Sequence, residues 1–243
     1  MIYTSKQNPL IKEIASLKDK KGRAKLGLYI AEGVKMVNEA IKNNLPIKMI
    51  VVTDVKYNEI NKTNCEIITV SQEVFNYLSD EITPQGALAV IEIFKGDIKP
   101  PKNNALILDG VSDPGNMGTI IRTAAALGYN DLYLINCVDP YMGKVVRASM
   151  SGIYFVNLYK CDLNSCLDAL KGHKIIVADM KGKSVNDYKI NGKFAIAVGN
   201  EANGISNDLY LKASEVVSIP MESTSESLNV AVCAGILMYK FKY

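Results

Sequence analysis

The chain has 243 residues, of which 48% are apolar and 22% charged, and its formal net charge is +3. A chain of this length and apolar content can bury one large core or two smaller ones, which argues against a disordered protein. No apolar run approaches the roughly 20 residues of a membrane-spanning helix, and the first residues, MIYTSKQNPLIKEI, lack the apolar core of a signal peptide. We therefore expect a soluble, cytoplasmic protein.

The amino-terminal half alternates helix and strand patterns. Pro9 to Leu17 is expected to form a helix capped by Asn8, and a strand from Leu28 leads into a helix over Val34 to Lys42. Three further strands are expected at KMIVVT, EIITV and ALAVIEI, with SQEVFNYL as a helix between the last two. This pattern predicts a small α/β domain over residues 1–96.

A basic cluster lies near the start of this domain. Between Lys6 and Lys25 the chain carries seven basic residues and only two acidic ones, Glu13 and Asp19. Such a cluster can neutralise phosphates and bind nucleic acid through released counterions. On charge alone, a solvated helix face explains it equally well.

The stretch FKGDIKPPKNN has two adjacent prolines, a glycine and alternating charges, so residues 97–104 are expected to form a linker. Beyond it, helices are expected at MGTIIRTAAAL, GKVVRASM, LNSCLDAL and from about Leu228 to Phe241, between strands at ALILD, DLYLI, YFVNLY, KIIVAD, FAIAVG and EVVSIP. Strands this apolar, separated by helices, predict an α/β domain over residues 105–243 with a mostly parallel sheet and helices on both faces.

Three segments of this second domain share one design: DGVSDPGNMGTIIRTAAALGY from Asp109, AVGNEANGIS from Ala197 and IPMESTSESLNVAVCAGI from Ile219. Each runs from an apolar strand pattern through a turn rich in Gly, Asn, Ser or Pro into a helix. The three loops could therefore gather at one sheet edge, where parallel sheets bind ligands. In the first segment, Pro114 and Gly115 are expected in the turn. Asn116 and Arg122 are spaced so that both can contact one substrate; alternatively, Asn116 caps the helix and Arg122 lies on its solvated face.

Together these segments resemble the SpoU (TrmH) family of RNA ribose 2'-O-methyltransferases in the SPOUT superfamily. Upstream, NPLIKEIASLKDKKGRAKLGLYIAEG resembles the substrate-binding domain of the same family. The resemblance implies a carboxy-terminal trefoil knot, S-adenosyl-L-methionine as cofactor, an RNA substrate and a homodimer. The lysine-rich amino-terminal domain resembles that of ribosomal-RNA modifiers, so 23S ribosomal RNA is the expected target and transfer RNA the alternative.

The resemblance also implies roles for individual residues. The expected catalytic residues are Asn116, Arg122, Glu201, Ser227 and Asn229, and the expected cofactor-binding residues are Gly199, Ile219, Met221 and Leu228. RNA-binding roles are expected for Lys18, Lys20, Lys21, Arg23, Lys25 and Arg147, with Ser149 near the same groove. The family's arginine is often described as the general base, but a guanidinium with a pKa of about 12 or more is a poor base near neutrality. We therefore expect Arg122 to bind the target phosphate and stabilise developing negative charge.

Other chemistries find little support. The five cysteines are scattered without paired metal-ligand spacing, and the only histidine, His173, directly precedes a strand pattern, so no metal is expected. The GKS at Gly182 has Val177 where a phosphate-binding loop needs its first glycine, and no strand is followed by G-x-G-x-x-G. Two further alternatives stay open: a base-modifying SPOUT enzyme, and a ribosome-associated RNA-binding protein without catalytic activity.

Overall fold

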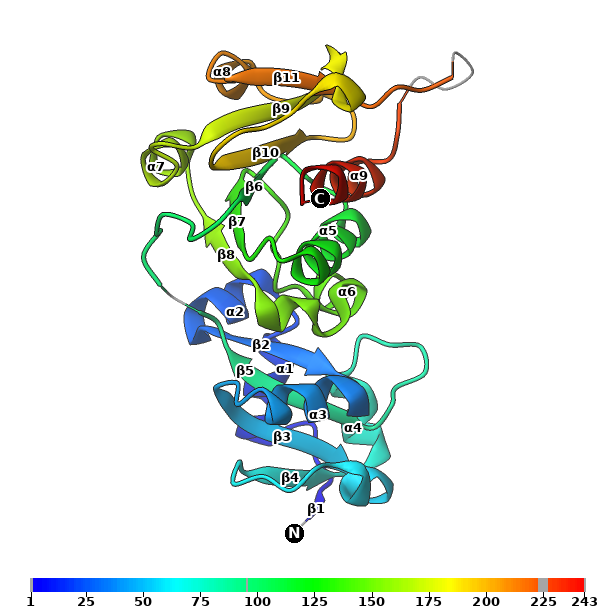
Figure 1. Cartoon of the computed structure of the whole chain (residues 1–243). Coiled ribbons are helices and arrows are strands. Elements are labelled where there is room, and N and C mark those ends of the chain that lie inside the picture. The colour runs from blue at the N-terminus through cyan, green and yellow to red at the C-terminus, as the bar shows by residue number, and fades with distance from the viewer. Residues whose placement is uncertain (1, 95, 223–226, 243) are drawn as a thin grey trace. The chain divides into compact units, whose positions relative to one another are not determined.

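The computed structural model describes residues 2–94, 96–222 and 227–242 (Figure 1). The chain divides into two compact units. One comprises Met1–Lys95 and Tyr141–Tyr154, and the other comprises Gly96–Pro140 and Phe155–Tyr243. The segment Tyr141–Tyr154 thus belongs with the amino-terminal unit, although it lies well beyond the linker in sequence. The assignment of separate functions to residues 1–96 and 105–243 stays a prediction.

The first unit is an α/β sandwich around a five-stranded mixed sheet. The strand order is β1-β4-β3-β5-β2, with β3 and β1 parallel to β4, and with β5 antiparallel to β3 and β2. Its elements are β1 (Ile2–Tyr3), α1 (Pro9–Ser16), α2 (Lys20–Leu26), β2 (Leu28–Glu32), α3 (Val34–Lys42), β3 (Ile47–Thr53), the 3-10 helix η1 (Asp54–Glu59), β4 (Ile67–Val70), α4 (Gln72–Leu78) and β5 (Ala87–Glu92). The expected helices and strands of this half are all present, and Asn8 caps α1 by accepting a hydrogen bond from the Leu10 amide.

The segment Tyr141–Tyr154 packs into this unit through α6 (Gly143–Ser149). The Tyr141 ring lies 5.0 Å from the ring of Tyr29 on β2, and the Tyr154 hydroxyl donates a hydrogen bond to the Met36 carbonyl on α3. Val145 and Val146 of α6 are buried. Apolar burial, which the local sequence pattern cannot direct to a particular partner, therefore joins this segment to the first unit.

The second unit is built on a six-stranded sheet in which every pair is parallel, in the order β11-β9-β10-β6-β7-β8. Its elements are β6 (Ala105–Asp109), α5 (Pro114–Leu127), β7 (Asp131–Ile135), β8 (Asn157–Lys160), α7 (Leu163–Ala169), β9 (Lys174–Ser184), the 3-10 helix η3 (Val185–Asp187), β10 (Phe194–Gly199), α8 (Asn207–Tyr210), β11 (Glu215–Ser218) and α9 (Val230–Lys242); the 3-10 helix η2 (Met150–Phe155) follows α6. The predicted α/β fold with a mostly parallel sheet is confirmed. The trefoil knot stays a prediction.

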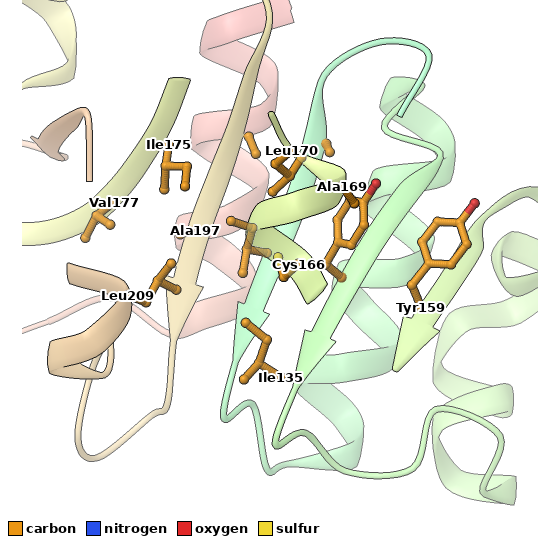
Figure 2. Close-up of a cluster of buried hydrophobic side chains, with 13 residues drawn as sticks. Ile135, Tyr159, Cys166, Ala169, Leu170, Ile175, Val177, Ala197 and Leu209 are labelled. Atoms are coloured by element: carbon orange, nitrogen blue, oxygen red, sulfur yellow. The ribbon is translucent and has the colours of Figure 1, made fainter. Parts of the chain in front are cut away.

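Helices cover both faces of this sheet. On one face, α7 and α8 pack over alternate strand residues, and Figure 2 shows Cys166 of α7 and Leu170 at its end among Ile135, Tyr159 and Ala197 of the strands. On the other face, α5 and α9 lie side by side (Figure 1). The Tyr129 hydroxyl after α5 donates a hydrogen bond to the Met238 carbonyl of α9. Because both faces are covered, the central strands β6, β7 and β10 are buried over nearly their whole length, as expected for a parallel sheet.

Two strand ends bring distant loops together. β6 and β10 are adjacent and parallel, and Gly199 lies opposite Asp109 in their register. The loops that follow these strands therefore leave the sheet side by side. The first runs into α5, which begins at Pro114 rather than at Met117 as expected, because Asp113 caps the helix and proline fits its first position. The sequence interpretation of Pro114 and Gly115 as turn residues was thus wrong by one helical turn.

Strand β9 extends beyond the expected KIIVAD through to Ser184, where it pairs with β11 across a register shift. A side chain at Gly182 would lie 2.5 Å from the Val217 backbone, so the pairing depends on glycine at this position. No helix within the described residues is long and apolar enough to cross a membrane.

Candidate active site

A chain of hydrogen bonds links the three glycine-bearing segments. The Asn229 side-chain amide donates to Asn116 Oδ1 at 2.8 Å, and the Asn116 amide in turn donates to Glu201 Oε1 at 3.0 Å. Asn116 lies in the first turn of α5, Glu201 follows β10, and Asn229 directly precedes α9. Three of the five predicted catalytic residues therefore meet at one place.

Glu201 is the centre of this cluster. Its Oε1 also accepts the Asp113 amide, and its Oε2 accepts the Ser112 amide and, at 2.9 Å, the Ser112 hydroxyl. Partial burial raises the pKa of the Glu201 carboxyl, but the hydrogen bonds from Asn116, Asp113 and Ser112 outweigh burial and lower that pKa to about 2. The carboxylate is therefore ionised at any physiological pH and holds the loop before α5 in place.

Three residues that build this cluster were not predicted from the sequence. Ser112 and Asp113 supply hydrogen-bond donors to Glu201, and Asn200 ties its loop to the neighbouring one by donating to the Gly110 carbonyl at 2.8 Å. The Asn200 side-chain oxygen also accepts the amides of Ala202 and Asn203. A signal was present for Asp113, because aspartate directly before proline is a typical start of a helix. Ser112 carried no comparable signal.

Asn229 also caps the first turn of α9. Its Oδ1 accepts the Ala231 amide at 2.9 Å and the Val232 amide at 3.3 Å. One side chain thus fixes the start of α9 with its oxygen and orients Asn116 with its nitrogen.

A cavity of about 490 Å³ opens beside this cluster. Its described lining includes every predicted cofactor-binding residue, namely Gly199, Ile219, Met221 and Leu228, and also Glu201, Ser227 and Asn229. The remaining walls come from β9, β10, β11 and α9, including Asp179, Val217 and Leu237. Within residues 2–94, 96–222 and 227–242, no group of three or more His, Cys, Asp or Glu side chains is placed to hold a metal ion.

Gly199 allows a close approach, but to the chain itself. A Cβ atom at this position would lie 2.3 Å from the Gly204 backbone, and Asn200 and Gly204 exchange two backbone hydrogen bonds of 2.9 Å each. The turn of the AVGNEANGIS segment therefore closes tightly against the end of β10. Contact between Gly199 and a bound ligand stays a prediction.

Arg122 lies apart from the hydrogen-bonded cluster. It is on the exposed face of α5, it is not among the lining residues of the cavity, and its guanidinium makes no hydrogen bond or ion pair with any residue that the structure describes. A cation held outside the cavity suits contact with a ligand that approaches from solvent.

The basic cluster of the first unit separates into two groups. The first group consists of Lys20, Lys21 and Lys25, which are exposed on α2. Arg23, in contrast, is buried and donates to the carbonyls of Leu17 and Lys18, and Lys18 donates to the Ser79 carbonyl and pairs with Asp80 at 3.2 Å. Arg23 therefore has a structural role between α1 and α2, and the surface available to RNA is narrower than the sequence suggested.

Arg147 and Ser149 also have contacts within the protein. Arg147 forms an ion pair with Glu81, and Ser149 is fully buried and donates its hydroxyl to the Val146 carbonyl at 2.7 Å. The Ser149 hydroxyl thus satisfies the end of α6, and a position of Ser149 near a substrate groove stays a prediction.

Comparison with known proteins identifies the family of the chain. Residues 103–239 match the SpoU rRNA Methylase family, and residues 8–89 match the MRM3-like substrate binding domain. The chain is 31% identical to the 23S rRNA (guanosine(2553)-2'-O)-methyltransferase RlmP of Bacillus subtilis over 98% of both chains. It is also 31% identical to the 23S rRNA (adenosine(1067)-2'-O)-methyltransferase of Streptomyces laurentii, over 66% of this chain and 59% of that protein.

Among solved structures, the AdoMet-bound rRNA methyltransferase of Sinorhizobium meliloti superimposes with a TM-score of 0.88 at 27% identity, covering 99% of this chain and 96% of the other. The similarity thus extends over both units, and the family match covers the strands and loops that form the cavity and the Asn116–Glu201–Asn229 cluster. The chain belongs to the SpoU rRNA methylase family.

Proposed function

We propose that this protein is an S-adenosylmethionine-dependent RNA methyltransferase that modifies a ribose 2'-hydroxyl in 23S ribosomal RNA. The observation that carries this proposal is the convergence of Asn116, Glu201 and Asn229 beside a cavity lined by the predicted cofactor-binding residues. The relatives that act on 23S ribosomal RNA support the choice of substrate over transfer RNA. A protein that modifies ribosomal RNA is expected to be located in the cytoplasm.

The cavity suits the cofactor in size and chemistry. A volume of about 490 Å³ falls within the usual range for small-molecule sites, which runs from roughly 300 to 1,000 Å³. Apolar side chains such as Ile219, Leu228 and Leu237 can pack against an adenine. When bound, S-adenosylmethionine supplies an electrophilic methyl group.

The residues around the cavity then position the substrate and stabilise the charge that develops during the reaction. The ionised Glu201 holds Asn116 through a hydrogen bond, and Asn229 holds the other end of the same amide. Asn116 is thereby fixed in one orientation, which favours alignment of a ribose hydroxyl with the methyl group. Arg122, free of partners among the described residues, binds the phosphate of the target nucleotide and stabilises negative charge that develops on the attacking oxygen. Ser227 lies in the cavity wall beside these groups.

RNA binding extends to the first unit. Lys20, Lys21 and Lys25 present three positive charges from one short stretch of exposed surface. These charges can contact phosphates without reading the sequence, leaving the choice of nucleotide to the catalytic site.

We infer that two copies of the chain form a homodimer through α9. Val232, Ile236 and Tyr239 are 50%, 39% and 62% exposed and recur at helical spacing, so they form an apolar stripe along one side of this helix. A second copy can bury the stripe against its own. Light scattering after size exclusion tests this: the wild type should have twice the mass of one chain, and Ile236→Glu should shift it toward the monomer. A monomeric wild type would refute the dimer.

One experiment tests the proposed activity directly. Ribosomal RNA from cells with and without the protein is reverse-transcribed at low nucleotide concentration, at which a 2'-O-methyl group causes a stop. A stop in 23S ribosomal RNA that depends on the protein supports the proposal, while identical patterns refute it. Calorimetry with S-adenosylmethionine separates the enzyme from an inactive RNA-binding protein, because the latter should give no heat of cofactor binding.

A further inference from the structure

The described lining of the cavity carries negative charge and no positive charge. Asp179 and Glu201 are its two carboxylates, and neither lysine nor arginine is among the described lining residues. A cavity of this kind favours a cationic ligand over a neutral one of the same shape.

The two carboxylates differ in how far the protein already uses them. Both oxygens of Glu201 accept hydrogen bonds from the loop before α5. Asp179, on β9, accepts one hydrogen bond at Oδ1 from the Lys181 amide at 2.8 Å. No hydrogen bond from a described residue reaches Asp179 Oδ2, and the side chain is partly exposed toward the cavity that it lines. Asp179 therefore keeps acceptor capacity for a ligand.

We propose that Asp179 makes the cavity prefer the sulfonium form of the cofactor, S-adenosylmethionine, over the demethylated product, S-adenosylhomocysteine. This inference rests on the proposed function. Both ligands share the adenosine, the α-ammonium and the α-carboxylate, so contacts to these groups cannot separate them. They differ by the methyl group and by one positive charge on sulfur. A carboxylate in the wall attracts that charge over several ångströms and so strengthens binding of the cofactor. The product, with its neutral sulfur, lacks this attraction and must leave after each turnover.

The size of the effect follows from screened electrostatics. Two unit charges about 6 Å apart in a partly solvated site, with an effective dielectric constant of about 40, alter an equilibrium constant by about tenfold. The preference should fall as the salt concentration rises, because the cavity is open to solvent.

Substitution by asparagine isolates the charge. Asp179→Asn keeps an oxygen that can accept the Lys181 amide, so this local contact within β9 is preserved. Asp179→Glu restores the charge at slightly longer reach. Asp168→Asn is a matched control, because it removes one carboxylate charge from the same unit at an exposed position on α7 outside the cavity.

Isothermal calorimetry measures the dissociation constants of both ligands for the four full-length proteins. We expect Asp179→Asn to weaken S-adenosylmethionine binding about tenfold and S-adenosylhomocysteine binding far less, so that their ratio moves toward equality. Asp179→Glu and Asp168→Asn should retain the wild-type ratio. An unchanged ratio in Asp179→Asn, or equal weakening of both ligands, overturns the inference. A wild-type protein that binds neither ligand overturns the proposed function itself, which distinguishes the two failures.

Discussion

Replacement of Glu201 by glutamine tests whether its ionised carboxylate organises the site. Glutamine has the same length but a single oxygen, so its amide nitrogen must face donors that now bond to one of the carboxylate oxygens. Of the five hydrogen bonds to the carboxylate, the two at Oε1 or the three at Oε2 are then lost or must rearrange, depending on which way the amide is turned. Hydrogen bonds to a charged group contribute about 1.5–3 kcal/mol each, but water replaces lost partners at an exposed site, so we expect a total loss of about 1–2 kcal/mol.

The assay is transfer of labelled methyl groups from S-adenosylmethionine to ribosomal RNA at saturating substrate. A loss of about 1–2 kcal/mol in positioning lowers turnover about 5- to 30-fold. Glu92→Gln, which removes an exposed carboxylate from β5, serves as the control and should have wild-type turnover. Wild-type turnover and wild-type thermal stability in Glu201→Gln would refute the reasoning.

The pH dependence of stability gives a second measurement on the same variant. The pKa of Glu201 is lowered to about 2 in the folded protein, whereas the pKa of a glutamate in an unfolded chain is about 4.3. The stabilisation is therefore fully present above the unfolded value and is lost as the pH falls toward the folded value. The difference in unfolding free energy between wild type and Glu201→Gln should be constant from pH 7 to about 5 and should shrink below about 4.3. A difference that grew on acidification would contradict the assignment.

Three further substitutions test other parts of the structure. Arg122→Lys should lower turnover by about tenfold or more with unchanged cofactor affinity, because Arg122 does not line the cavity and a lysine cannot bind phosphate through a fork of two donors; near-normal turnover would show that the guanidinium is unnecessary. Gly199→Ala should lower the melting temperature and weaken cofactor binding measured by calorimetry, since its methyl group would lie 2.3 Å from the Gly204 backbone, and an unperturbed protein would disprove this tight turn. Arg147→Glu should destabilise the protein by about 1–3 kcal/mol by placing a carboxylate beside Glu81, and adding Glu81→Arg should recover part of the loss in chemical denaturation; destabilisation without any recovery would argue against the ion pair.

Local sequence patterns predicted the elements well because helices and strands have fixed periods of apolar residues. The apolar strand patterns of the second unit, separated by helix patterns, indicated a parallel sheet covered by helices. The start of α5 was misplaced because Pro114 was interpreted as a turn residue rather than as the first residue of a capped helix. The resemblance of three segments to a known family then indicated that Asn116, Glu201 and Asn229 belong together, and the structure places them in one hydrogen-bonded chain.

Contacts between distant segments were beyond such patterns. Arg23 belongs to a basic stretch that suggests an RNA-binding surface, yet it is buried and donates to main-chain carbonyls. Whether this side chain is buried depends on how α1 packs against α2. Nothing in the sequence distinguishes Ser112 from other serines. Its role follows only from the tertiary structure, in which its hydroxyl donates to Glu201 on a neighbouring loop.

By itself, the sequence determined the class of fold, the order of the elements and the chemical types present in the three loops, because these depend on periodicity and on the properties of single residues. Tertiary structure alone decided which carboxylate is held by five donors, which arginine is buried and which aspartate faces the cavity. These features depend on where parallel strands end relative to one another, and that register is set by packing across the whole sheet.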